Sequence, residues 1–137
     1  MRTAIDTNVF SALWSNETTA SLVEGRLGDA KNEGGLVVSA PVYAELLAHA
    51  KATESFVTDF LSDTGVVVDF EIQRPVWAEA GRRFARYANR RRRSANEEPR
   101  RLLTDFLVGA HALAQADRLM TLDAKRYRRD FPELRLI

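Results

Sequence analysis

The feature that most constrains the fold is an alternation of short apolar segments with amphipathic helical patterns along the whole chain. Between the apolar segments, apolar residues recur at spacings of three and four, the period of a helix with one buried face. Strands that alternate with helices in this way predict an α/β fold with a mostly parallel sheet covered on both faces. The expected strands are 2–5, 36–38, 66–70, 118–121 and 134–137.

The helical patterns begin and end at recognisable residues. Thr18 or Thr19 can cap one helix, and Ser39 with Pro41 in the following turn marks the start of another. A long helix is expected from Pro75 into a run of arginines, followed by an exposed polar loop. Further helices are expected after Asp6, over 53–62 and over 102–116.

The length of 137 residues favours one domain. The chain has no Cys, which excludes a disulfide scaffold, a Cys-ligated zinc site and a thiol nucleophile, and fits a reducing compartment. No apolar run approaches the roughly 20 residues of a membrane span, and the N-terminus lacks the pattern of a signal peptide. We therefore expect a cytoplasmic protein without membrane association.

The formal net charge of +1 hides an uneven distribution of charge. The segment 82–101 holds nine Arg, and its only acids are Glu97 and Glu98. Arg binds phosphate with two parallel hydrogen bonds, so such a cluster can follow a nucleic-acid backbone or meet an acidic partner. The alternative is a solvated helix end. The candidate binding residues are Arg90, Arg91, Arg92, Arg93, Arg100 and Arg101.

Carboxylates follow several of the expected strands. Asp6 ends the first strand, Glu45 lies early in the helix after the second, and Asp123 lies just past a later strand. The carboxyl ends of parallel strands meet at one edge, where α/β proteins place their sites. Asp105 lies in the first turn of its helix, and the pattern alone does not fix whether it reaches that edge.

Several carboxylates in one cavity repel one another unless cations neutralise them. Mg²⁺ and Mn²⁺ prefer oxygen ligands, and such ions can activate a water for phosphodiester hydrolysis. The alternative is that these acids are isolated caps and surface charges. A phosphoacceptor domain is disfavoured for two reasons. The first motif reads Asp6-Thr7-Asn8 instead of Asp-x-Asp, and no Lys lies at the end of a late strand.

Four motifs occur in order along the chain, at 4–10, 41–46, 105–112 and 119–123, the last followed by the pattern Tyr127, Phe131-Pro132 and Leu134. Together they resemble the PIN domain, and their spacing and the total length are similar to the VapC-type toxins of type II toxin–antitoxin systems. The similarity covers essentially the whole chain.

This resemblance implies a single PIN domain over 1–137, an α/β/α sandwich with a central sheet of four to five strands. It implies an endoribonuclease dependent on Mg²⁺ or Mn²⁺, with an acidic site of Asp6, Glu45, Asp105 and Asp123. Asp6 and Asp105 would be the principal metal ligands and Asp123 would complete the shell. Glu45 would hold or deprotonate the attacking water, leaving 3′-hydroxyl and 5′-phosphate ends.

The resemblance also supplies partners and supporting residues. Thr7 and Asn8 would orient the first acid, Asn8 being the better candidate. The implied partners are a VapB-type antitoxin, an RNA substrate and a second copy of the chain in a homodimer. A DNA-directed or structure-specific PIN nuclease and a non-catalytic nucleic-acid-binding module remain alternatives. His49 and His111 are expected to be packing or surface residues.

Overall fold

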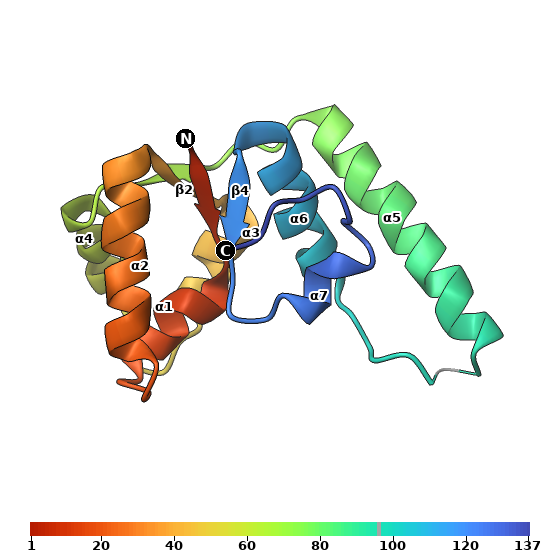
Figure 1. Ribbon diagram of the computed structural model, residues 1–137, viewed down its shortest axis with the longest axis horizontal. Coiled ribbons are helices and arrows are strands. Elements are labelled where there is room, and N and C mark those ends of the chain that lie inside the picture. Colours follow the sequence, from red (N-terminus) through yellow and green to blue (C-terminus); the bar gives the residue numbers. More distant parts are fainter. Residues whose placement is uncertain (96) are drawn as a thin grey trace.

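The computed structural model describes residues 1–95 and 97–137. In this part of the chain, four parallel strands form one sheet in the order β3-β2-β1-β4 (Figure 1). The predicted parallel sheet is thus confirmed. The strands are β1 (Thr3–Ile5), β2 (Leu36–Ser39), β3 (Val66–Asp69) and β4 (Arg118–Met120).

The expected fifth strand at 134–137 is not formed. The C-terminal segment makes a single parallel bridge, between Leu119 and Leu136. Leu134 is buried, and its N–H donates to the Phe131 carbonyl in a turn, so it is not available to a neighbouring strand. Pairing therefore starts only at Arg135, two residues before the last residue of the sequence.

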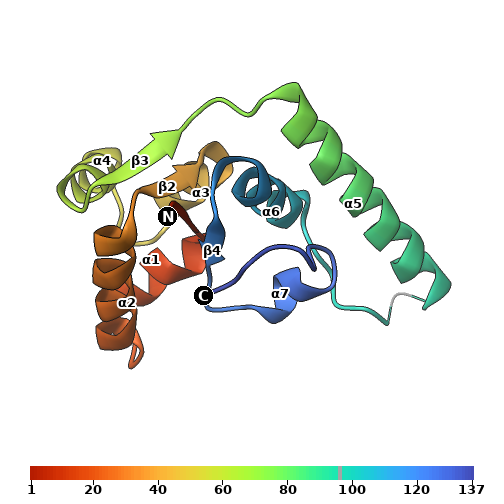
Figure 2. The ribbon, with the colours of Figure 1, turned by 45° about the horizontal axis from the view of Figure 1, so that its top comes forward.

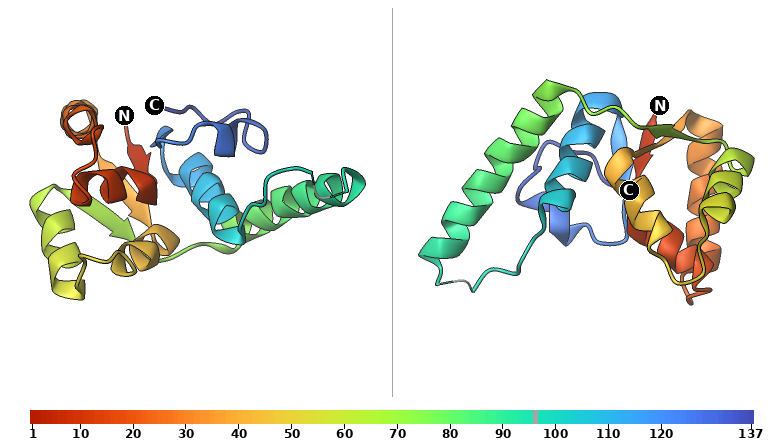
Figure 3. Two further views of the ribbon diagram at one scale, coloured as in Figure 1. Left: turned by 90° about the horizontal axis from the view of Figure 1, so that it is seen from below. Right: turned by 180° about the vertical axis from the view of Figure 1, so that it is seen from behind.

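Helices cover both faces of the sheet, which confirms the expected α/β/α arrangement. Figure 3 shows α2 and α7 on one side of the sheet and α3 and α6 on the other. The long helix α5 packs on α6 and extends away from the sheet (Figure 2). The helices are α1 (Thr7–Trp14), α2 (Ala20–Glu33), α3 (Ala40–Leu47), α4 (Glu54–Asp63), α5 (Arg74–Arg93), α6 (Leu103–Gln115) and α7 (Lys125–Arg128).

Burial explains why the strands read as continuous apolar runs. Every residue of β1, β2 and β4 is buried, as expected for strands of a parallel sheet covered on both faces. The strand β3 lies at the edge, and its Val67 is 58% exposed. Within the described residues, no helix is long and apolar enough to cross a membrane.

The C-terminal segment is fixed against α6 by a close approach at Gly109. A Cβ atom at this position would lie 2.5 Å from the Cε2 atom of Phe131. Phe131 in turn packs on Phe106 and Tyr127. This packing holds α7 beside the carboxyl ends of β1 and β4, where Asp6 and Asp123 lie.

Candidate active site

Asp6 is the centre of the candidate site. It ends β1 and caps α1, since its Oδ1 accepts a hydrogen bond of 2.8 Å from the Thr7 N–H. Its Oδ2 accepts from the hydroxyls of Thr121 and Tyr127, each at 2.9 Å. The side chain is buried, and burial raises the pKa of the Asp6 carboxyl while the three hydrogen bonds oppose the increase.

Glu45 reaches the same place from α3. The Thr7 hydroxyl donates to its Oε1 at 2.7 Å. Partial burial raises the pKa of Glu45, the Thr7 hydrogen bond opposes this, and the negative charges of Asp6 and Asp105 raise it further. Glu45 is therefore electrostatically coupled to two of the other predicted acids.

Asp105 and Asp123 complete the group of acids, with Arg126 between them. Asp105 caps α6 through its Oδ2, which accepts from the Leu102 N–H at 3.2 Å. The Arg126 Nη1 atom lies 3.5 Å from Asp105 Oδ1, and its Nε lies 3.4 Å from Asp123 Oδ2. The structure thus brings all four predicted acids to one edge of the sheet, including Asp105, whose position the helical pattern left open.

Thr7 and Asn8 support the acids differently from what was expected. Thr7 contacts Asp6 through its backbone N–H and Glu45 through its hydroxyl. Asn8 donates from Nδ2 to the Thr121 hydroxyl at 3.2 Å and accepts from the Leu122 N–H at 3.0 Å. Thr121 then donates to Asp6, so Asn8 acts on the first acid through Thr121.

Sequence reasoning missed Thr121, Arg126 and Tyr127 as parts of this site. Thr121 lies in the motif that predicted Asp123, and Arg126 and Tyr127 follow that motif within four residues of Asp123. Their polar groups, next to a predicted acid at the end of a strand, were the available signal. Nothing in the local pattern showed that Thr121 and Tyr127 turn toward Asp6.

The donor set suits a hard divalent cation, because the four acids supply oxygen ligands only. Across residues 1–95 and 97–137, no three His, Cys, Asp or Glu side chains are arranged to hold a metal ion. Arg126 is instead the cation nearest to two of the acids. Burial works against its charge, but Asp105, Asp6 and Asp123 raise the pKa of the guanidinium.

The family model described as the PIN domain matches residues 3–132. The chain belongs to the PIN domain family. The position of the acids at the carboxyl edge of its sheet is the arrangement that the four motifs predicted for a PIN domain. A comparison with curated proteins finds no match.

Two solved structures are similar to this PIN domain over its whole length. One is VapBC2 from Rickettsia felis bound to a DNA fragment from its promoter, with a TM-score of 0.65 and 21% identity, covering 100% of this chain and 98% of that chain. The other is VapBC-1 from nontypeable Haemophilus influenzae, with a TM-score of 0.65 and 20% identity, covering 100% of this chain and 97% of that chain. At these identities the similarity shows the fold.

The predicted arginine cluster is partly engaged within this PIN domain. Arg90 forms an ion pair with Asp130 at 2.6 Å and another with Glu98 at 3.4 Å. Arg91 donates from Nε to the Glu98 carbonyl, and Arg92 donates to Asn89. Arg93 and Arg100 are exposed, and Arg101 lines a small pocket together with Lys125 and Arg129.

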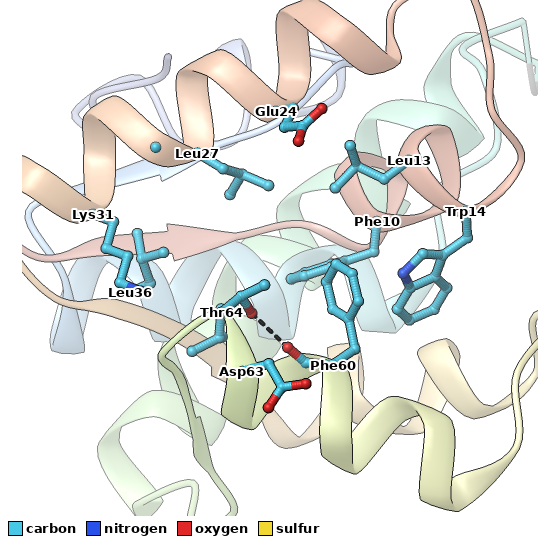
Figure 4. A pocket seen from close by; sticks show the side chains of 12 residues that line it. Phe10, Leu13, Trp14, Glu24, Leu27, Lys31, Leu36, Phe60, Asp63 and Thr64 are labelled. Atoms are coloured by element: carbon cyan, nitrogen blue, oxygen red, sulfur yellow. Dashed lines mark hydrogen bonds between the residues drawn. The ribbon is translucent and has the colours of Figure 1, made fainter.

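A separate apolar groove lies between α1, α2 and α4 (Figure 4). Its volume is about 480 Å³, and its walls include Phe10, Trp14, Leu27 and Phe60. The Trp14 Nε1 donor is buried and has no hydrogen-bond partner among the described residues. The groove lies outside the acidic site.

His111 is a packing residue, as expected. It is buried on α6, and its Nε2 lies 2.9 Å from Asp69 Oδ2 at the end of β3. His49 lies 3.1 Å from the Ser15 hydroxyl and packs on Trp14. Neither histidine contacts the four acids in the described part of the chain.

Proposed function

We propose that this PIN domain, spanning 1–137, is a metal-dependent endoribonuclease and the VapC-type toxin of a type II toxin–antitoxin module. The observation that carries the proposal is the convergence of Asp6, Glu45, Asp105 and Asp123 on one edge of the sheet. The two VapBC complexes with the same fold support the assignment to this class of nuclease.

In the proposed hydrolysis, the residues of the site have separate roles in metal binding, proton transfer and positioning. Asp6, Asp105 and Asp123 would hold Mg²⁺ or Mn²⁺, which when bound supplies an activated water and positive charge at the phosphate. Glu45 accepts a proton from the attacking water, and its raised pKa brings it closer to the range useful for a base. Thr121 and Tyr127 hold Asp6 in place. The products carry 3′-hydroxyl and 5′-phosphate ends.

Basic residues that lie within four positions of Asp105 or two of Asp123 in the sequence offer a path for RNA. Arg101, Lys125 and Arg129 line one pocket at the end of α5 nearest to α7, and Arg93 and Arg100 are exposed nearby. Phosphate contacts from such residues would hold a cytoplasmic RNA across the acidic site without reading its sequence. Arg90 serves mainly to hold Asp130 and Glu98 in place.

The apolar groove is our candidate site for an antitoxin of the VapB type. Its walls, which include Phe10, Trp14, Leu27 and Phe60, suit an apolar segment of such a partner. A homodimer is proposed through the exposed aromatic side chains of Phe70 and Trp77, which do not line the groove and are 62% and 50% exposed.

The test is cleavage of labelled RNA and DNA by the purified protein with Mn²⁺, compared with the Asp6→Asn variant. Asp59→Asn, a change of the same kind at an exposed position of α4, is the matched control. We expect the wild type and Asp59→Asn to cleave RNA, and Asp6→Asn to be inactive. Cleavage of DNA alone would favour a DNA-directed nuclease, and no cleavage of either would favour a binding module.

A further inference from the structure

Arg126 occupies an unusual position for a cation. It comes from α7 and lies within ion-pair distance of both Asp105 and Asp123, two of the three carboxylates proposed to bind metal. Its side chain is 34% exposed, so the guanidinium is partly shielded from water. The site therefore contains a fixed positive charge in the region where a divalent ion is expected.

The contacts that hold Arg126 are weak in geometry. The two distances, 3.5 Å to Asp105 and 3.4 Å to Asp123, are long for charge-assisted hydrogen bonds. The Nε atom is buried and has no hydrogen-bond partner among the described residues. The guanidinium is thus held by the charge of the acids and not by a paired, two-bond geometry, and a stronger cation can displace it.

We propose that Arg126 is a resident counter-ion that competes with the divalent metal for Asp105 and Asp123. The inference rests on the proposed function. A guanidinium and a divalent ion a few ångströms apart repel each other strongly where water is partly excluded, so the two do not share these carboxylates. Arg126 neutralises the acids in the metal-free protein and lowers the affinity of the site for metal.

The experiment measures Mn²⁺ binding to the metal-free, full-length protein by isothermal titration calorimetry. Arg126→Met removes the competing charge. Arg128→Met is the matched control, because Arg128 is exposed on the same helix and the change in net charge is identical. We expect Arg126→Met to bind Mn²⁺ about tenfold more tightly than the wild type, a difference of about 1.4 kcal/mol. The Mn²⁺ affinity of Arg128→Met should stay within about twofold of the wild type, well below the tenfold change expected for Arg126→Met.

A second variant and a second readout separate competition from a general loss of structure. Arg126→Lys keeps the charge and should bind Mn²⁺ much as the wild type does. Without metal, Arg126→Met should melt at a lower temperature than Arg128→Met, because its acids have lost their counter-ion. Saturating Mn²⁺ should remove that difference.

Equal or weaker Mn²⁺ binding by Arg126→Met would overturn the inference, since Arg126 would then be neutral toward the metal or would help to place its ligands. If RNA cleavage by the wild type persists in that case, the proposed function stands and only the competition is lost. If neither protein binds Mn²⁺ and neither cleaves RNA, both proposals fail.

Discussion

The hydroxyl of Tyr127 donates a hydrogen bond to Asp6 Oδ2 at 2.9 Å, across 121 residues of sequence. Both side chains are buried, and the bond ties α7 to the end of β1. Burial raises the pKa of Asp6, and of all the hydrogen bonds that oppose this increase, the one from Tyr127 has the largest effect. Tyr127 therefore orients the first acid and opposes part of the increase in its pKa.

Tyr127→Phe should lower the free energy of unfolding by about 1.5–3 kcal/mol, because a buried carboxylate loses a hydrogen-bond donor. It should also raise the pKa of Asp6 further and move the acid limb of the cleavage profile to higher pH. Chemical denaturation and pH–rate profiles measure the two effects. Tyr43→Phe is the control, since Tyr43 packs on Phe70 and is not among the described donors to the Asp6 side chain, which are Thr7, Thr121 and Tyr127. Identical pH–rate profiles for Tyr127→Phe and Tyr43→Phe would show that the Tyr127 hydroxyl does not affect the pKa of Asp6.

The stability of the metal-free protein should depend on pH through Asp6. Because the pKa of Asp6 is raised in the folded state above its ordinary value of 3.8, its ionised form costs stability at neutral pH. This cost is relieved as the pH falls through the raised pKa. The free energy of unfolding of the wild type, relative to Asp6→Asn, should therefore increase from neutral pH toward pH 4. A flat difference in urea denaturation across this range would show that the pKa is not raised.

Gly109→Ala should destabilise the protein by about 1–3 kcal/mol, because the new methyl group would overlap the ring of Phe131. Gly81→Ala is the matched change, since a Cβ on that residue of α5 meets nothing within 4 Å. Removing glycine from a helix should stabilise the chain there by up to about 1 kcal/mol. Thermal melting of the two variants tests whether their stability changes in these opposite directions. A stable Gly109→Ala variant would mean that the C-terminal segment is not packed tightly on α6.

Leu27→Asp places a charge in the apolar groove and should abolish neutralisation by an antitoxin partner while RNA cleavage remains. Leu22→Asp is the control, because Leu22 is exposed on the same helix and does not line the groove. Inhibition of cleavage by the co-expressed and purified partner is the measurement. If the partner still inhibits Leu27→Asp fully, it binds elsewhere.

Arg101→Ala should weaken RNA binding and make it less sensitive to salt. Each lost phosphate contact lowers the slope of log K against log salt concentration by about 0.7 for a single strand. Arg26→Ala removes the same charge from α2, on the opposite side of the molecule from the end of α5 (Figure 1), and should leave the slope unchanged. Binding of labelled RNA to the Asp6→Asn protein at several salt concentrations tests this. Identical slopes of log K against log salt concentration for the two variants would show that Arg101 makes no contact with the RNA phosphates.

The C-terminal segment shows where apolar sequence patterns no longer predict a strand. Apolar runs ending in Asp6 and near Asp123 were enough to place both acids at one edge, because parallel strands share a direction. The run at 134–137 looked the same, yet only one bridge forms there, since Leu134 is used in a turn and in the core. An apolar pattern does not reveal which partner a backbone N–H will find.

The sequence by itself predicted the α/β class and the sheet edge near Asp6 and Asp123, because these depend on periodicity and on adjacency along the chain. The set of four acids came from the motifs that resemble the PIN domain. Only the tertiary structure decided that Asp105 reaches that edge and that Tyr127 and Thr121 hold Asp6. It also decided that Arg90 pairs with Asp130 and that Arg126 lies between Asp105 and Asp123. These contacts depend on how β4, α6 and α7 pack beside β1, and packing between distant segments leaves no local signature in the sequence.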